Sequence, residues 1–427
     1  MRSFLRMASA AAIALVAELP LAGQQPTFRS TVDLIAVDVQ VVDGNGRPIP
    51  RLEADRFAVE INGQKRRVVS VDFVEHTDPD APARLPRSLV DSGHPGTAPP
   101  RVYVLGVDVA SFSVAESRAV IEGARDFITR LQPEDSVGIY AFPIGPKYRP
   151  STDHAAILRQ LDAIVGSREA LHNSHALSPI DVIDIMAEIT KSGLAQDSDP
   201  LPGRGPQAQA SRSETLDDIV ARECGPLDRP CAQGVLAEAQ GMSFVLEGQA
   251  TETFSGLRQL VRALGTIDGR KTLVLLSAGM PVSDRPGGKP DVGELPRLLG
   301  QEAAGTNTTI YAVFLETAFT QMVSAKSQYP GRSFGDGREQ TVFGRLMEEF
   351  TGASGGALLP VAQGTGIGQF ERVLRETSSR YLLGVEPAPA DRDGTLRQLS
   401  VKVKGLPRGT SVRSRLWVVV PKATSKF

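Results

Sequence analysis

The amino-acid sequence predicts an α/β fold. We expect a doubly wound, mostly parallel sheet with helices on both faces, and a small antiparallel β-sandwich built from the N- and C-terminal strands. Short unbroken apolar runs in the middle of the chain are typical of strands buried on both faces of a parallel sheet. Segments with helical periodicity separate these runs, and parallel strands need such crossovers. Near both ends the apolar residues alternate instead, as they do in antiparallel strands.

The first folded element is expected to be a small antiparallel β unit at residues 31–75. Apolar and β-branched residues fill two stretches, of which the first ends at a turn at residues 43–46 and the second at Asn62 and Gly63. Asn-Gly is a strong signal for a tight hairpin turn. Residues 76–100 contain six prolines and little periodicity, so we interpret them as an extended linker.

The α/β domain is predicted at residues 101–385. Four apolar runs of strand length are expected to form its sheet, at residues 102–107, 137–142, 273–276 and 310–315. Apolar residues at helical spacing predict helices around 120–131, 157–164, 346–350 and 370–374. Residues 381–385 are expected to end the parallel sheet. The strands at 386–420 are predicted to join the N-terminal β unit.

A helical insertion is predicted at residues 166–264. After Cys231 the apolar residues keep near-3.6 spacing without proline, which indicates one long helix closed by Gly265. Four glycines inside it leave a break as the alternative, since each costs up to about 1 kcal/mol relative to alanine.

The beginning of the chain matches a secretory signal peptide at residues 1–23. Arg2 and Arg6 precede an apolar run, and small residues follow it, with cleavage expected near Ala22 or Gly23. No later stretch approaches the roughly 18–20 apolar residues of a spanning helix. We therefore expect an exported protein, periplasmic or secreted, without a transmembrane segment in its mature chain.

The net charge of the chain argues against nucleic acid as a partner. The chain of 427 residues carries 47 Lys and Arg against 49 Asp and Glu, a net charge of −2. A chain without excess positive charge is poorly suited to hold a polyphosphate backbone. Nucleic acid is therefore not expected as a partner.

The two cysteines, Cys224 and Cys231, are expected to form a disulfide. They flank a short loop rich in Gly and Pro, and an oxidising compartment favours the bridge. A metal site would need further ligands, but none of the five histidines is near the cysteines in sequence. His172 and His175 form an H-x-x-H pattern, which we interpret as two polar residues of a loop and not as metal ligands.

The segment that ends the first buried strand, residues 107–113, resembles von Willebrand factor A (VWFA) domains. Support comes from residues 131–138, 269–277 and 350–356 and from the closing hairpin around 401–404. The chain looks like the exported VWFA-related proteins of Acidobacteria, and the similarity covers most of residues 31–420.

The resemblance implies a metal-ion-dependent adhesion site. In the family an Asp-x-Ser-x-Ser loop, a later Thr and a second Asp hold Mg²⁺ or a similar ion, and the candidate ligands here are Asp108, Ser111 and Ser113. Both serines are displaced by one position, Ala278 stands where the second Asp is expected, and the Thr candidates, Thr251 and Thr253, fall inside the predicted long helix. We therefore predict a degenerate site and no cofactor. Asp284 could supply a second carboxylate, and the alternative role of Asp108 is to end a strand and cap the next helix.

Three functions follow in order of preference. The first is a non-enzymatic module that binds a protein partner or acts as an envelope scaffold. The second is metal-dependent adhesion through Mg²⁺ or Mn²⁺. The third, a hydrolase, is disfavoured because the G-x-S-x-G pattern around Ser354 follows a predicted helix, whereas a nucleophile elbow follows a strand.

Overall fold

The computed structural model describes residues 34–76, 100–168, 174–195, 216–224, 228–285, 288–316, 338–361 and 366–422. All of them belong to one unit, Leu34–Phe427. The signal peptide expected at 1–23 and nearly all of the linker expected at 76–100 lie outside the described residues.

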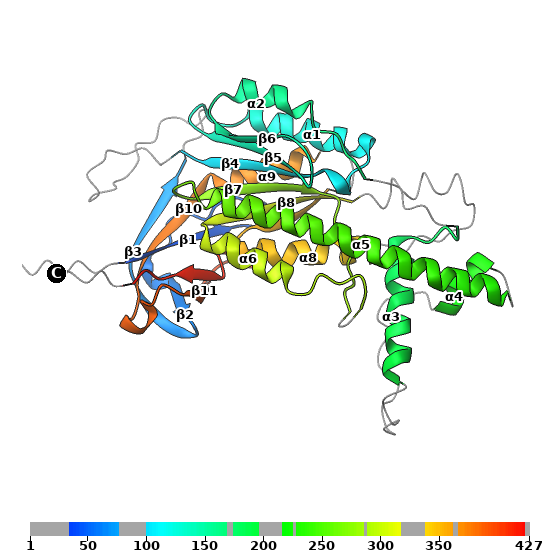
Figure 1. Cartoon of the computed structure of the whole chain (residues 1–427). Coiled ribbons are helices and arrows are strands. Elements are labelled where there is room, and N and C mark those ends of the chain that lie inside the picture. Colours follow the sequence, from blue (N-terminus) through cyan, green and yellow to red (C-terminus); the bar gives the residue numbers. More distant parts are fainter. Residues whose placement is uncertain are drawn as a thin grey trace, which may run out of the picture. The chain divides into compact units, whose positions relative to one another are not determined.

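The larger sheet has seven strands in the order β12-β1-β10-β3-β2-β11-β13, and every neighbouring pair is antiparallel (Figure 1). Its strands are β1 (Ile35–Val42), β2 (Phe57–Ile61), β3 (Gln64–Glu75), β10 (Ser379–Glu386), β11 (Leu396–Val403), β12 (Ser411–Arg413) and β13 (Trp417–Val419). The β2–β3 turn has positive φ at Asn62 (48°) and Gly63 (74°), the conformation that the Asn-Gly pair predicts. Strands from both ends of the chain thus share one sheet.

The second sheet has six strands in the order β6-β5-β4-β7-β8-β9. Its strands are β4 (Val102–Asp108), β5 (Ser136–Phe142), β6 (Lys147–Ser151), β7 (Lys271–Ser277), β8 (Thr308–Leu315) and β9 (Ala357–Val361). Four pairs are parallel, whereas β6 runs antiparallel to β5. Gly138 lets β6 approach, because a Cβ there would meet the Tyr148 carbonyl oxygen at 2.8 Å.

Helices pack against the six-stranded sheet in two apolar clusters. One cluster contains α1 (Val114–Thr129), α2 (His154–Leu161) and α9 (Ile367–Thr377), and the other contains α5 (Arg229–Leu264), α6 (Leu295–Gly305) and α8 (Arg338–Ser354). Alternate β4 residues supply the two clusters, with Leu105 in the first and Val104 in the second. The clusters therefore lie on opposite faces of the sheet (Figure 1).

The predicted fold class is wrong. The chain does not add a small β-sandwich to a doubly wound, mostly parallel sheet of the VWFA type, because its larger sheet is a single antiparallel one of seven strands and the six-stranded sheet is mixed. The error has a physical origin in β10. Residues 381–385 read as a buried apolar run, but every second residue of β10 is buried, as expected for an antiparallel strand with one covered face.

The long helix predicted after Cys231 is present as α5, which begins at Arg229. Asp228 caps it by accepting the Cys231 N–H at 3.1 Å, and Gly265 ends it. The C-terminal half of α5 packs on the six-stranded sheet. Its N-terminal half packs on α3 (Pro179–Ala195) and α4 (Leu216–Cys224) through a separate apolar cluster that includes Ile185 and Ile219.

A buried polar network connects the two sheets at the end of α9. The Glu376 side chain is fully buried and accepts from Arg372 Nε at 2.8 Å and from Arg413 of β12. Gln40 of β1 donates to the Glu376 carbonyl at 3.1 Å and accepts from the Tyr311 hydroxyl of β8 at 2.7 Å. Both sheets therefore bond to one helix end.

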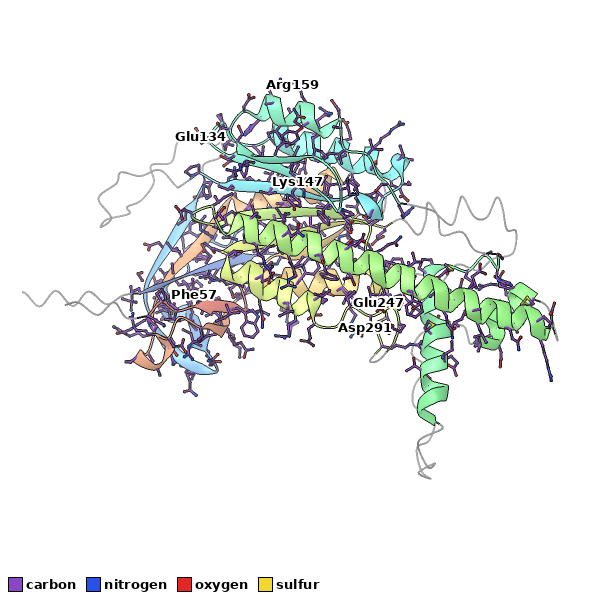
Figure 2. The ribbon with its side chains drawn as sticks, in the orientation of Figure 1. Phe57, Glu134, Lys147, Arg159, Glu247 and Asp291 are labelled. Carbon is purple, nitrogen blue, oxygen red and sulfur yellow. A yellow bond between two sulfur atoms is a disulfide. The ribbon has the colours of Figure 1, made fainter. Side chains whose placement is uncertain are left out.

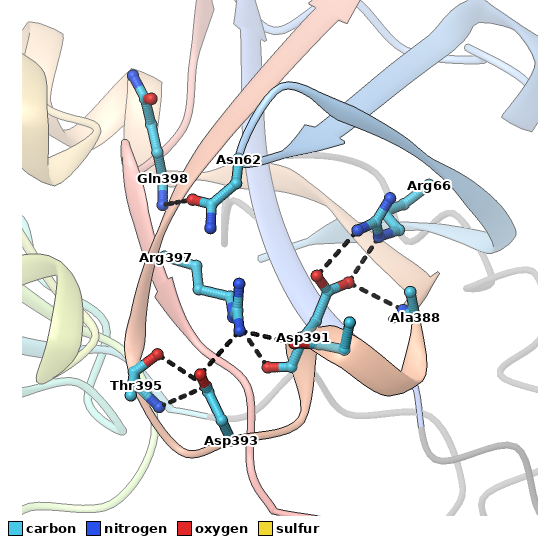
Figure 3. A network of polar contacts seen from close by, with 9 residues as sticks. Asn62, Arg66, Ala388, Asp391, Asp393, Thr395, Arg397 and Gln398 are labelled. Atoms are coloured by element: carbon cyan, nitrogen blue, oxygen red, sulfur yellow. Dashed lines mark hydrogen bonds and ion pairs between the residues drawn. The ribbon is translucent and has the colours of Figure 1, made fainter.

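A second polar network closes the outer part of the seven-stranded sheet (Figure 3). Asp391 accepts two hydrogen bonds from Arg66 of β3, at 2.6 and 2.8 Å, and one from the Ala388 N–H at 2.9 Å. Hydrogen bonding to Arg66 holds the pKa of Asp391 below its usual value, although burial opposes this. The pair fixes the β10–β11 connection against β3.

We expect Glu376→Gln to lower the free energy of unfolding by about 3 kcal/mol, because it removes one partner of a buried ion pair and leaves two guanidinium groups without their carboxylate. Urea unfolding followed by circular dichroism measures the change. Glu371→Gln on the same helix is the matched control. Glu371 pairs with Arg130 at a half-exposed position, so we expect a cost of at most about 1 kcal/mol. Equal effects in the two variants would contradict this account.

Candidate functional site

The candidate site lies at the carboxyl ends of β4 and β7. Asp108 is the last residue of β4 and only 1% exposed, and Ser277 is the last residue of β7 and fully buried. The two strands are parallel, with Val107 opposite Leu276, so the chain places Asp108 and Ser277 side by side. The Ser277 hydroxyl donates to Asp108 Oδ2 at 3.0 Å.

Ser111 joins the two strand ends. It closes a short 3₁₀ turn (Val109–Ser111) after β4, where its hydroxyl donates to the Asp108 carbonyl at 2.8 Å and accepts from the Ala278 N–H at 2.9 Å. The Gly279 N–H donates to the Ser277 hydroxyl at 3.1 Å. Gly279 has φ of 95°, and a Cβ there would meet Phe343 at 2.7 Å, so glycine is required for this turn.

Ser113, the third predicted ligand, has a different role. It caps α1 in a capping box, in which its hydroxyl accepts from the Glu116 N–H and the Glu116 carboxylate accepts from the Ser113 N–H at 2.7 Å. Asp108 makes no side-chain capping bond to the 3₁₀ turn that follows it. The structure therefore brings Asp108 and Ser111 together with Ser277, and it assigns the capping role considered for Asp108 to Ser113.

Burial dominates the electrostatics of Asp108. It raises the pKa of this carboxyl from 3.8 to about 7, although the nearby hydroxyls of Ser277, Ser111 and Thr253 offset part of the effect. Thr253 is a buried residue of α5, so the long helix supplies one of the hydroxyls that lower this pKa. Among the described residues, no group with hydrogen-bond geometry partners Asp108 Oδ1.

These residues fit a divalent ion poorly. Mg²⁺ prefers an octahedral set of oxygens with carboxylate charge and bound waters. Within the described part of the chain, Asp108 belongs to no cluster of three Asp, Glu, His or Cys side chains with ligand spacing, and neither does Asp284. The Ser111 and Ser277 hydroxyls already donate to Asp108 and accept from backbone N–H groups. The donor set is therefore one carboxylate of raised pKa and two hydroxyls that are already engaged with Asp108 and with backbone N–H groups.

The segment after β7 is anchored to α5 and α3. Glu247 of α5 pairs with Lys289 at 2.9 Å and accepts from the Asp291 N–H at 3.0 Å, and Figure 2 labels Glu247 and Asp291. Arg285 lies 3.4 Å from Asp184 of α3. These ion pairs hold the loop that begins at the candidate site.

Three exposed apolar side chains, Val114, Ile144 and Val165, form what we call the apolar rim, with exposed fractions of 49%, 84% and 52%. Val114 begins α1 just after the site. Ile144 is two residues beyond Phe142, which pairs with Asp108 across β4 and β5. Val165 precedes Gly166, whose N–H donates to Ser117 of α1 at 3.0 Å. The rim therefore borders the carboxyl ends of β4 and β5.

Ser354, the serine of the G-x-S-x-G pattern, is a structural residue. It is 2% exposed at the end of α8, where its hydroxyl donates to the Thr351 carbonyl at 2.8 Å and accepts from the Ile310 N–H at 2.9 Å. Both bonds go to the backbone, so the hydroxyl links α8 to β8.

The predicted disulfide between Cys224 and Cys231 is present, and it joins the end of α4 to the first turn of α5. His175 lies beside it, with a ring nitrogen and both sulfurs all within 4.8 Å of one another. Sequence reasoning missed this neighbour because 49 residues separate His175 from Cys224 and only tertiary packing joins them. His172 lies outside the described residues.

No protein-family model matches this chain, and no curated protein matches it. The resemblance to VWFA domains therefore stays a prediction. Every helix among the described residues is too short or too polar to cross a bilayer. This and the disulfide are compatible with an exported protein.

Asp108 predicts a pH dependence of stability. Its folded pKa, about 7, lies above its ordinary value, so between these limits the folded state binds more protons than the unfolded chain. The free energy of unfolding should fall as pH rises from about 4 to about 7, by up to roughly 4 kcal/mol.

The measurement is urea unfolding at several pH values. Asp108→Asn should remove this component, matching the wild type at pH 4 and exceeding it in stability at pH 8. Asp55→Asn, at an exposed position, should leave the wild-type pH profile unchanged. An Asp108→Asn profile parallel to that of the wild type would show that the carboxyl does not carry the effect.

Proposed function

We propose that this protein is an exported, non-enzymatic module that binds a protein partner, or serves as an envelope scaffold, through the apolar rim. The observation that carries the proposal is the placement of three exposed apolar side chains around the carboxyl ends of β4 and β5. Ligands of open α/β sheets bind at this edge. Exposed apolar side chains that are held in place by a rigid base suit contact with a protein surface.

The Asp108 cluster supplies that base. Ser111 and Ser277 bond the end of β4 to the end of β7, and the capping box of Ser113 fixes the first turn of α1. Arg168 adds an ion pair to Glu116 at 2.8 Å and a hydrogen bond to the Ser111 carbonyl at 3.1 Å. Loops held in this way lose little conformational entropy on binding, which favours affinity.

Binding without a metal ion is the preferred form of the proposal. A buried carboxyl with a pKa near 7 and engaged hydroxyls offers little charge to a divalent cation. Metal-dependent adhesion through Mg²⁺ or Mn²⁺ is the second candidate. The observation in its favour is Asp108 Oδ1, a buried oxygen without a hydrogen-bond partner among the described residues.

The test is capture from an envelope extract by the immobilised mature chain, with and without EDTA. We expect one partner to be retained in EDTA, lost by Ile144→Asp and kept by Val69→Asp. Val69 is a matched control because it is an exposed apolar residue of β3, in the other sheet. Charge on Ile144 should weaken binding at least tenfold, since it must be desolvated in the interface. Capture that Ile144→Asp leaves unchanged would remove the rim from the proposal.

Binding of a divalent ion is tested separately by thermal unfolding. On the preferred proposal, Mg²⁺ and Mn²⁺ leave the melting temperature of the wild type unchanged. A rise that Asp108→Ala abolishes, together with capture that EDTA prevents, would replace ion-independent binding with metal-dependent adhesion.

A further inference from the structure

The disulfide and His175 lie in a small, built site that the apolar rim does not use. Among the described residues, His175, Cys224 and Cys231 are the one group of at least three His, Cys, Asp or Glu side chains whose ligand atoms come close enough to surround a metal ion. All three are partly exposed, so an ion could enter from solvent. The group combines the end of α4, the first turn of α5 and the loop before α3.

Glu238 orients the histidine. Its carboxylate accepts from His175 Nδ1 at 2.5 Å, from the His175 N–H at 3.1 Å and from the Ser174 N–H. Burial alone would raise the pKa of Glu238, but these hydrogen bonds outweigh it and hold the pKa below its ordinary value. The loop is therefore tied to α5 by a charged acceptor.

A carboxylate bound to one imidazole nitrogen is the arrangement that positions metal-binding histidines in proteins. With Nδ1 engaged by Glu238, Nε2 is the nitrogen that remains for a ligand. Gly234 makes room for the ring, because a Cβ there would lie 3.0 Å from His175 Cε1 and 3.3 Å from Nε2. Gly234 and Glu238 are one turn apart on α5, so one helix face both receives and orients the ring.

In the disulfide form the sulfurs are bonded to each other and are poor metal ligands. Reduction would leave two thiols beside the imidazole. Cys231 lies in the first turn of α5, where the N-terminal end of the helix favours a thiolate. Two soft thiolates and an imidazole suit Zn²⁺, whereas Mg²⁺ and Ca²⁺ prefer oxygen ligands.

We propose that reduction of the Cys224–Cys231 disulfide creates a zinc site made of both thiolates and His175 Nε2. An external dithiol breaks the S–S bond by giving two electrons and two protons, and is itself oxidised to a disulfide. Zn²⁺ then displaces the two thiol protons and binds both sulfurs and the imidazole, with water as the fourth ligand. Reoxidation of the thiols by a disulfide donor releases the ion. The disulfide thus holds α4 against α5 in the oxidised chain, and the zinc ion does so in the reduced chain.

The experiment uses the whole mature chain without a histidine tag, reduced with a phosphine and titrated with Co²⁺ and then Zn²⁺. We expect one Co²⁺ per reduced chain, with the visible absorption of a tetrahedral thiolate complex, and its displacement by Zn²⁺. The oxidised chain should show no such absorption. Absence of the complex in the reduced wild type overturns the proposal.

Three variants separate the roles of the ligands. His175→Asn should lower the affinity for Zn²⁺ at least tenfold, and Glu238→Gln should lower it about 10- to 100-fold by releasing the ring. His154→Asn is the control, since His154 bonds the Asp135 carbonyl at 2.7 Å and lies outside the cluster. Circular dichroism of each reduced variant reports whether it is folded. If folded His175→Asn binds Zn²⁺ as tightly as the wild type, the cysteines act alone and the three-ligand site is wrong.

Discussion

The buried carboxylate of Glu376 is the interaction on which the arrangement of the two sheets depends. The chain passes without a loop from α9, which covers the six-stranded sheet, into β10, which lies inside the seven-stranded sheet. A charge enclosed at this junction must be compensated, and Arg372 and Arg413 compensate it from the helix and from β12. Gln40 of β1 donates to the backbone carbonyl of Glu376 and accepts from Tyr311 of β8, so both sheets are bonded to this junction.

Local signals in the sequence were sufficient for most of the strands and helices. The runs at 102–107, 137–142, 273–276 and 310–315 all lie in strands of the six-stranded sheet, because continuous apolar character reports burial on both faces. The strand β6 carried no such signal, since it is an exposed edge strand that contains Pro150. The fold class failed at β10, whose partners are set by contacts distant in sequence.

The position of the candidate site was predictable in part, because a continuous apolar run shows where a buried strand ends. Asp108 and Ser111 follow a recognisable strand, so their position at a sheet edge could be read from the chain. Ser113 caps α1, a role that the sequence did not distinguish from that of a ligand, because a capping box and a ligand loop use the same residue types at similar spacing. His175 could not have been found, since its proximity to the cysteines depends on how α3, α4 and α5 pack.

The length of α5 has a mechanical consequence. A helix rises about 1.5 Å per residue, so the 22 residues from Cys231 to Thr253 span roughly 33 Å. The disulfide lies at one end of this span, and Thr253, whose hydroxyl helps to lower the pKa of the buried Asp108 carboxyl, lies at the other. Apolar packing on α3 and α4 near the first end, and on the six-stranded sheet near the second, joins these two regions through one continuous helix with no loop between them.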